Sequence, residues 1–296
     1  MILTLLVVPF SIGITHFAFA ATKQTDQHQL YEQIVAEVSI YNPNFTIEYY
    51  GGTQNLSEEL EKAMHTIRED YPYYYENISK WHASYSYTTM KASITFTINY
   101  LTTFQQEQYV DEQIVLLANQ LFTHDMSDYE KIKVVHDYVV LNTEYSSDTQ
   151  ASQYTTYSLI KEGKAVCQGY AFFVYRMLQE ADVPVKYVKG YAGDQLHGWN
   201  LVYVNNHWYH LDTTWDDPLP NNNNEIKYKY FLLSDEQIEK THTWERESYP
   251  KALKEKNTLY NMRLILREDL KSPIYRFKYD FVMRNVYVDP KKLLVY

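Results

Sequence analysis

The stretch that decides the fold lies at residues 163–171 and runs Gly163-Lys164-Ala165-Val166-Cys167-Gln168-Gly169-Tyr170-Ala171. Apolar residues continue after it at helical spacing, at Val174, Tyr175 and Leu178, and Pro184 follows shortly after. We therefore expect a helix that begins at Cys167. The dipole and free N–H groups of a helix N-terminus favour a thiolate. The same N–H groups can stabilise an oxyanion that forms beside the sulfur.

The cysteine in this stretch is unusual because it is the only one in 296 residues, so Cys167 has no disulfide partner within the chain. A lone cysteine is more often a small buried hydrophobe than a nucleophile. The expected helix start reverses that preference. Gly169, two residues later, is expected to leave room for a substrate backbone to approach.

A hairpin is expected after this helix and after a strand at residues 185–191. Its two strands lie at residues 197–204 and 207–213, and two asparagines form the turn between them. A two-residue turn pairs the last residue of the first strand with the first residue of the second. That register puts His197 and Asp212 on one face, on a diagonal. Such neighbours lie roughly 7–8 Å apart at the backbone, so their side chains can hydrogen-bond.

Together these residues have the chemistry of a nucleophile, a base and an orienting acid, in the order Cys167, His197 and Asp212. A carboxylate bonded to an imidazole fixes its tautomer and supports its charged form. The imidazole in turn activates the thiol. The pattern indicates acyl-transfer chemistry, in which a thioester forms on the cysteine.

Three motifs resemble the core motifs of bacterial transglutaminase-like proteins. They are residues 163–171 as quoted above, His197-Gly198-Trp199-Asn200, and Trp208-Tyr209-His210-Leu211-Asp212-Thr213-Thr214-Trp215-Asp216-Asp217-Pro218. The resemblance covers roughly residues 105–245. It implies a papain-like α+β core and assigns the nucleophile to Cys167, the base to His197 and the acid to Asp212. The family includes transamidases, proteases, amidases and inactive scaffolds, so the resemblance specifies the machinery better than the substrate.

Further contacts to substrate or oxyanion are expected near this triad. Tyr157 resembles an upstream tyrosine of the family that helps line the oxyanion site. Gln168, Gly169 and Trp199 are the other candidates. Trp199, Trp208 and Trp215 could form an aromatic wall, although core packing around the hairpin is expected for at least two of them.

Two other histidines compete with His197 for a chemical role. His136 lies beside Asp137 in an expected helix, where a packing role is favoured. His210 falls on the same expected face as His197 and Asp212, and two histidines with one carboxylate can bind zinc. The HExxH spacing of zinc proteases is absent, so we expect no metal and no cofactor.

The region before the triad predicts a small α+β accessory domain at residues 24–104. Its expected helices lie at 27–39 and 55–70, and its expected strands at 44–50, 80–87 and 91–100. A helix at about 111–123 and a second one, opened by a capping box from Ser127 to Glu130, begin the catalytic domain at 105–245. The predicted class is α+β throughout, with residues 246–296 as an extension of unassigned role.

The N-terminus and the charge suggest where the protein works. Residues 1–21 carry no charged side chain, residues 2–10 are apolar, and Ala18-Phe19-Ala20 fits a cleavage signal. We expect a signal peptide at residues 1–20, cut near Ala20, and hence a secreted or cell-surface protein. A retained membrane anchor is the alternative. The net charge of -10 and the lack of a basic cluster argue against nucleic acid as a partner.

The function expected from these observations is that of an exported cysteine-dependent enzyme acting on peptide or amide bonds. Its partner would be a peptide, a protein or a cell-wall peptide. Hydrolysis is favoured over protein crosslinking by amine transfer, because water discharges a thioester unless a pocket excludes it. A surface binding module with a vestigial triad is the non-enzymatic alternative.

Overall fold

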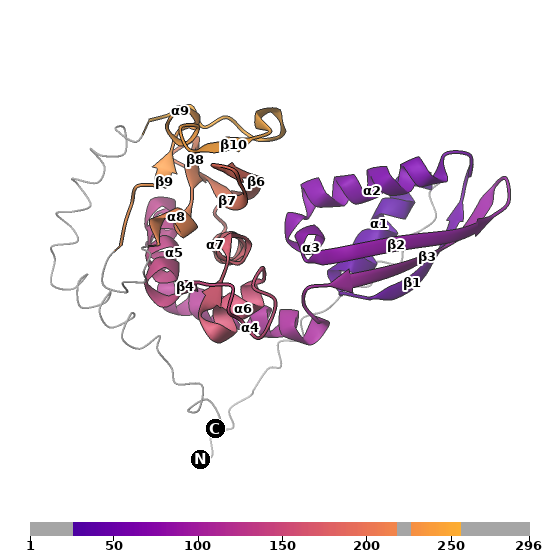
Figure 1. Ribbon diagram of the computed structural model, residues 1–296, viewed down its shortest axis with the longest axis horizontal. Helices are drawn as coiled ribbons and strands as arrows, with labels where there is room; N and C mark the ends of the chain where they lie inside the picture. Colours follow the sequence, from indigo (N-terminus) through magenta and orange to yellow (C-terminus); the bar gives the residue numbers. More distant parts are fainter. Residues whose placement is uncertain (1–25, 218–225, 256–296) are drawn as a thin grey trace, which may run out of the picture.

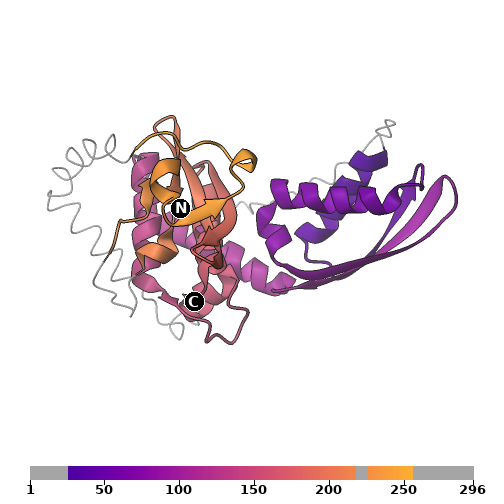
Figure 2. The same cartoon turned by 45° about the horizontal axis from the view of Figure 1, so that its top comes forward.

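The computed structural model describes residues 26–217 and 226–255 of the 296-residue chain. These residues form two lobes that meet along one side, as Figures 1 and 2 show. The expected signal peptide at residues 1–20, the run of asparagines at 221–224 and most of the extension at 246–296 lie outside the described residues. Within the part that is described, no helix has the length and apolar character needed to cross a membrane.

The N-terminal lobe is a three-stranded antiparallel sheet covered on one face by helices (Figure 1). Its elements are α1 (Asp26–Ser39), β1 (Asn44–Tyr50), α2 (Leu56–Asp70), α3 (Pro72–Glu76), β2 (Ile78–Tyr87) and β3 (Lys91–Tyr100), with strand order β1-β3-β2. Alternate residues of β1 and β3 are buried, because one face of the sheet packs against the helices and the other meets solvent. The strands and helices lie close to their expected positions.

Helix boundaries differ from expectation at two places in this part of the chain. Helix α2 begins at Leu56, one residue later than expected, after Asn55 as N-cap residue. Helix α4 spans Phe104–Leu121 and starts earlier than expected, because Thr103 and Gln106 form a capping box at its start. The capping box before α5 forms as predicted.

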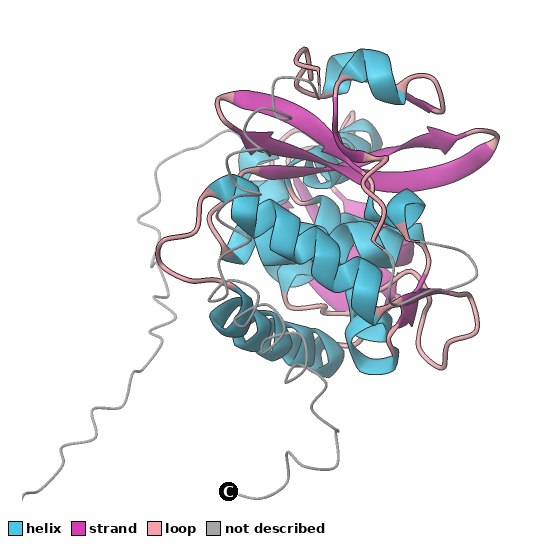
Figure 3. Ribbon diagram, turned by 90° about the vertical axis from the view of Figure 1, so that its left-hand side faces the viewer, coloured by secondary structure: helices cyan, strands magenta, loops and turns pink. Residues whose placement is uncertain are grey.

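The larger lobe packs a five-stranded antiparallel sheet against a layer of helices (Figure 3). Its remaining elements are α5 (Asp128–Asn142), β4 (Glu144–Tyr145), α6 (Thr156–Glu162), β5 (Lys164–Ala165), α7 (Cys167–Glu180), β6 (Val185–Ala192), β7 (Gln195–Val204), β8 (His207–Leu211), α8 (Thr213–Asp216), β9 (Phe231–Leu233), α9 (Asp235–Ile238), β10 (His242–Trp244) and η1 (Arg246–Ser248). The strand order is β10-β6-β7-β8-β9. Helices and strands together give the α+β class that the sequence predicts.

Helix α7 is the centre of this lobe. It is buried on nearly every side, because it packs against β6 and β7 of the sheet and against α4, α5 and α6. Phe173, Val174 and Leu178 belong to the main apolar core. A helix that is apolar all round is stable only when other elements cover it, and this burial holds its N-terminus in a fixed place.

The two lobes share a small aromatic cluster over α7. Tyr73 of α3 meets the ring of Phe172 edge-on at 5.2 Å, and Phe172 stacks on Tyr187 of β6 at 4.3 Å. Lys189 of β6 pairs with the Glu76 carboxylate of α3 at 2.6 Å. The N-terminal lobe is therefore anchored to the helix and strand that flank Cys167.

Candidate active site

Cys167 is the first residue of α7, as the sequence predicts. Val166 precedes it in an extended conformation and provides no side-chain cap. The first N–H groups of the helix are therefore not engaged by a capping side chain. Cys167 as a residue is partly exposed. The elements that hold it are α7 and the short parallel pair of β4 and β5.

The two residues after Cys167 have structural partners. The Gln168 side chain donates to the backbone oxygen of Glu76 at 3.1 Å, which ties α7 to the N-terminal lobe. Gly169 is buried, and a Cβ there would lie 2.6 Å from the Ala165 Cβ and 3.0 Å from the Thr155 oxygen. Gly169 therefore permits close packing inside the protein, and the expectation that it makes room for substrate is not met.

The hairpin register is confirmed. Val204 pairs with His207, and the ladder continues to Asn200 opposite Leu211. His197 lies further along β7, opposite Gly190 of β6. The returning strand ends earlier than expected because Asp212 leaves the ladder and becomes the N-cap of α8.

The structure brings His197 and Asp212 into direct contact. His197 Nε2 lies 2.8 Å from Asp212 Oδ2, and both side chains are almost fully buried. Burial opposes the charged imidazole, but the charge and hydrogen bond of Asp212, with a further contribution from Cys167, raise the pKa of His197 to about 10. His197 therefore carries its proton at neutral pH, and it is near enough to Cys167 for the two side chains to influence each other electrostatically.

The Asp212 carboxylate is fixed by four donors. Its Oδ1 accepts the backbone N–H groups of Thr214 at 3.0 Å and Trp215 at 3.2 Å. Its Oδ2 accepts from His197 and from Nε2 of His242 at 3.0 Å. Burial favours the neutral acid, but the two histidines outweigh it and lower the pKa of Asp212 to about 2. The Asp212 carboxylate is therefore ionised at neutral pH.

His242 is a member of this cluster that the sequence reasoning missed. It lies on β10, 30 residues beyond Asp212, in a segment of three-residue strands with no repeating pattern. The ligand atoms of His197, Asp212 and His242 all lie within 4.8 Å of one another, so these three are the described residues that could hold a metal ion. The contacts at 2.8 and 3.0 Å have the length of N–H···O hydrogen bonds, which satisfy the group as it stands.

His210, the expected competitor, belongs to a separate hydrogen-bond chain. Its Nδ1 accepts from the Trp199 indole at 2.9 Å, and its Nε2 lies 2.9 Å from Asp235 of α9. Burial lowers the pKa of His210 despite the neighbouring carboxylate. His210 therefore does not share a contact with Asp212, and the zinc group considered from the sequence does not form around it.

His136 is a packing residue, as expected. It is fully buried and lies between Asp137 at 3.0 Å and Asp216 at 3.2 Å. Its ring stacks on Tyr228 at 5.0 Å. Burial opposes protonation, but the two carboxylates raise the pKa of His136 above its usual value. The cluster joins α5 to the end of α8 and so supports the segment that carries Asp212.

Of the three tryptophans, two pack inside and one faces out. Trp199 is 1% exposed and stacks beneath His197 at 5.9 Å, so it supports the imidazole and does not form a substrate wall. Trp208 is partly buried against Tyr203. Trp215 is 38% exposed and lies 6.2 Å from the His197 ring, which makes it the aromatic group available to a ligand.

Two tyrosines besides Tyr157 are affected by the charge of Cys167. Tyr157 packs on the core and its ring contacts Tyr109 at 5.7 Å. Burial and the nearby charge of Cys167 raise the pKa of Tyr145, and burial, Glu76 and Cys167 do the same for Tyr187. A sequence scan cannot select these two among 31 tyrosines, because neither is adjacent to a motif.

Tyr187 also explains the glycine after His197. A Cβ on Gly198 would lie 2.5 Å from the Tyr187 hydroxyl, so only glycine lets this ring cross the strand. The contact places the Tyr187 hydroxyl next to the backbone of β7, the strand that carries His197.

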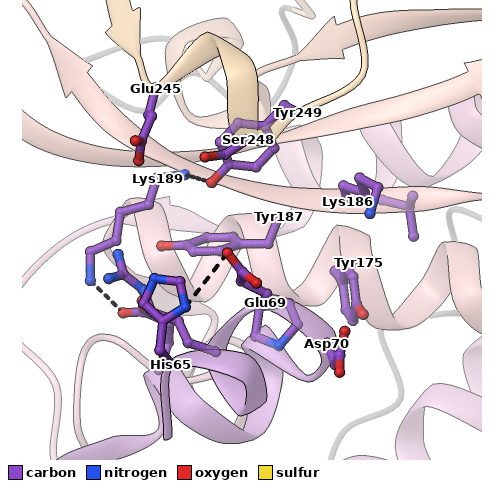
Figure 4. Close-up of a pocket in the computed structure, with 14 residues that line it drawn as sticks. His65, Glu69, Asp70, Tyr175, Lys186, Tyr187, Lys189, Glu245, Ser248 and Tyr249 are labelled. Atoms are coloured by element: carbon purple, nitrogen blue, oxygen red, sulfur yellow. Dashed lines mark hydrogen bonds and ion pairs between the residues drawn. The ribbon is translucent and has the colours of Figure 1, made fainter. Parts of the chain in front are cut away.

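A cavity of about 410 Å³ lies between the lobes, and Tyr187 forms part of its wall (Figure 4). Its walls come from α2 and α3 of the N-terminal lobe and from β6 and the segment around Tyr249 of the larger lobe. Tyr187 and Glu76 are part of its lining, and the Glu76 backbone contacts Gln168. Tyr187 and Glu76 therefore connect the lining of the cavity with the hairpin and with helix α7.

Comparison with known proteins agrees with this geometry. Residues 116–213 match the transglutaminase-like superfamily, so this part of the chain is a transglutaminase-like domain. That range includes Cys167, His197 and Asp212 but ends before His242.

Two curated relatives are the kyphoscoliosis peptidases of Mus musculus and Homo sapiens, each 27% identical over 121 residues. The match covers 35% of this chain and only 18% of either relative, so the chain spans a small part of their length. A solved structure described as a candidate cysteine protease from Cytophaga hutchinsonii is 18% identical, covers 49% of this chain and 68% of its own, and has a TM-score of 0.33.

Proposed function

We propose that the protein is an exported cysteine-dependent hydrolase of peptide or amide bonds, with Cys167 as nucleophile, His197 as base and Asp212 as the orienting acid. The observation that carries the proposal is the buried His197–Asp212 pair, which interacts with a partly exposed Cys167 at a helix N-terminus. Such a group has the nucleophile, the base and the orienter that acyl transfer through a thiol needs.

The reaction proceeds in two steps. The Cys167 sulfur attacks the carbonyl carbon, and the N–H groups at the start of α7 stabilise the oxyanion. As the C–N bond breaks, the leaving amine takes a proton from His197, and a thioester remains. In the second step water attacks the thioester, His197 accepts the proton of that water, and the carboxylic acid leaves with the thiol restored.

His197 suits both steps because of how it is held. Asp212 bonds to its Nε2, which leaves the other ring nitrogen for the thiol. Trp199 stacks against one side of the ring. The imidazole is therefore fixed in orientation and supported in its charged form, as the first step requires.

The substrate we propose is a polypeptide chain or a cell-wall peptide. Trp215 beside His197 offers an exposed aromatic surface, and the cavity between the lobes offers a polar one. The cavity lining carries both signs of charge, including Arg68, Lys186, Glu69 and Glu245, which suits a polar peptide better than an apolar ligand.

The branch between hydrolysis and amine transfer is decided by incubation with a glutamine-containing protein and a labelled primary amine. Hydrolysis predicts release of free acid with little amine incorporated, because water is abundant at a site that is open to solvent. Efficient amine incorporation would instead establish a crosslinking transamidase with the same triad. Failure of any substrate or suicide inhibitor to acylate a folded, accessible thiol would favour a binding module. The export part of the proposal is tested separately, by N-terminal sequencing of the mature protein for a start just after Ala20.

A further inference from the structure

We propose that His242 is a positioning residue of this active site, which holds the Asp212 carboxylate in the orientation that serves His197. The inference rests on the proposed function, because positioning has meaning only if the Cys167–His197 pair reacts. His242 lies outside residues 116–213, the part of the chain that matches the family.

Two histidines share one oxygen of the Asp212 carboxylate. His197 Nε2 and His242 Nε2 lie 2.8 and 3.0 Å from the same atom, Asp212 Oδ2. A carboxylate that bonds to the catalytic histidine alone can rotate or tilt about that single contact. With a second donor on Oδ2 and two backbone N–H groups on Oδ1, the carboxylate plane is fixed at both ends.

The His242 side chain is itself held by a neighbouring hydroxyl. Its Nδ1 lies 2.8 Å from the Thr241 hydroxyl, whose contact with the Ile238 carbonyl is longer, at 3.3 Å. An ionised carboxylate can only accept, so His242 carries a proton on Nε2, aimed at Asp212, and its Nδ1 can accept from the Thr241 hydroxyl. Thr241 therefore supports the tautomer in which Nε2 of His242 donates to Asp212.

An aromatic cage surrounds the His242 ring. Trp215, Trp199 and Tyr230 surround His242 at centroid distances of 4.8, 5.0 and 5.5 Å. His242 is 1% exposed, and its strand β10 pairs with β6 at Ala192. The cage excludes water from the Asp212–His242 contact, and a hydrogen bond to a charge is strongest where water is excluded.

The experiment measures alkylation of Cys167 by iodoacetamide near pH 6, where the rate reports the reactive thiol and no substrate is needed. Because Cys167 is the only cysteine, mass spectrometry gives the rate for this site alone. His242→Leu removes the donor and should slow alkylation by roughly 10- to 100-fold, the value of one hydrogen bond to a charged group. His242→Gln can place an amide N–H near the same oxygen and should stay within about threefold of wild type.

A double-mutant cycle separates positioning from simple loss of packing. In an Asp212→Asn background the carboxylate is gone, so His242→Leu should change the alkylation rate by less than about twofold. A structural role predicts the same loss in both backgrounds. His210→Gln is the matched control, because it alters a buried histidine of the same sheet that has no contact with Asp212.

The outcomes distinguish a failure of the proposed function from a failure of the proposed role of His242. If wild-type Cys167 is unreactive at pH 6, the proposed function fails. If wild type is reactive and His242→Leu alkylates equally fast, the proposal for His242 is overturned. If His242→Leu does not fold, Thr241→Val decides, because it keeps the ring but removes the group that supports its tautomer. A several-fold slower rate supports the proposal, and an unchanged rate overturns it.

Discussion

Asp212 reaches His197 from outside the strand that leads to it, with Oδ2 at 2.8 Å from the imidazole Nε2. Its other oxygen caps α8, so one residue ends a strand, begins a helix and orients the base. Because the backbone leaves the ladder at this residue, the carboxylate turns back over the hairpin toward His197. The site therefore depends on the junction between β8 and α8 as much as on the triad residues themselves.

Cys167 should be alkylated by iodoacetamide in the native protein near pH 6, faster than a free thiol. The helix N-terminus and the protonated His197 both stabilise the thiolate that reacts. Intact-mass measurement over time gives the rate, and Cys167→Ser is the control for adducts elsewhere. Labelling that occurs only after denaturation would mean an inert thiol.

His197→Ala should reduce turnover by roughly 10²–10⁴, the contribution expected of a general base. His210→Ala and His136→Ala should act mainly on stability, because their partners are Trp199 with Asp235 and Asp137 with Asp216 respectively. Turnover per folded molecule, with thermal unfolding of each variant, makes the comparison. A larger chemical loss in His210→Ala than in His197→Ala would contradict the assignment.

The ion pair should make stability depend on pH at both ends of the scale. The pKa of His197 is raised from 6.5 to about 10, so its contribution is fully present below about 6.5 and is lost as the pH rises to about 10. The pKa of Asp212 is lowered from 3.8 to about 2, so its contribution is present above about 3.8 and is lost as the pH falls to about 2. Urea denaturation across this range measures both limbs.

The control for this pH dependence is His197→Gln, which keeps a donor but cannot titrate. Between pH 6.5 and 10 it should lose less stability than wild type. Equal losses in the two proteins would show that other groups produce the alkaline limb.

Tyr73→Ala should destabilise the protein by roughly 3–5 kcal/mol, as expected for loss of a large buried aromatic side chain. Tyr73 packs on Phe172 of α7 and donates to the buried Glu107 at 2.6 Å, so it joins the lobes. Guanidinium denaturation gives the change. Tyr73→Phe keeps the ring and should lower the free energy of unfolding much less. Equal losses in the two variants would mean that the hydrogen bond to Glu107, and not the packing on Phe172, joins the lobes.

The same contact bears on the predicted independence of the first lobe. A chain of residues 105–296 lacks Tyr73 and exposes Phe172 and Tyr187, although every triad residue is present. It is expected to keep thiol reactivity at reduced stability. Insolubility of that shorter chain, with the full chain well behaved, would show that the two lobes need a common core.

The sequence by itself determined the local features of the site. The stretch at residues 163–171, followed by an apolar helical repeat, placed Cys167 at a helix start, and two asparagines fixed the hairpin register. These predictions succeed because the physical causes, helix periodicity and turn length, act within about ten residues of chain. The same local logic located the strands and helices of the first lobe.

Only the tertiary structure decided which distant residues complete the site. His242 reaches Asp212 because β10 pairs with β6. This pairing joins His242 to Ala192, which lies 50 positions earlier in the sequence, and no local pattern encodes it. Gly169 looked like a substrate contact because it adjoins Cys167, yet burial against Thr155 makes it a packing residue. Side-chain direction and burial are properties of the assembled core, since they depend on which elements pack together, and sequence distance does not specify them.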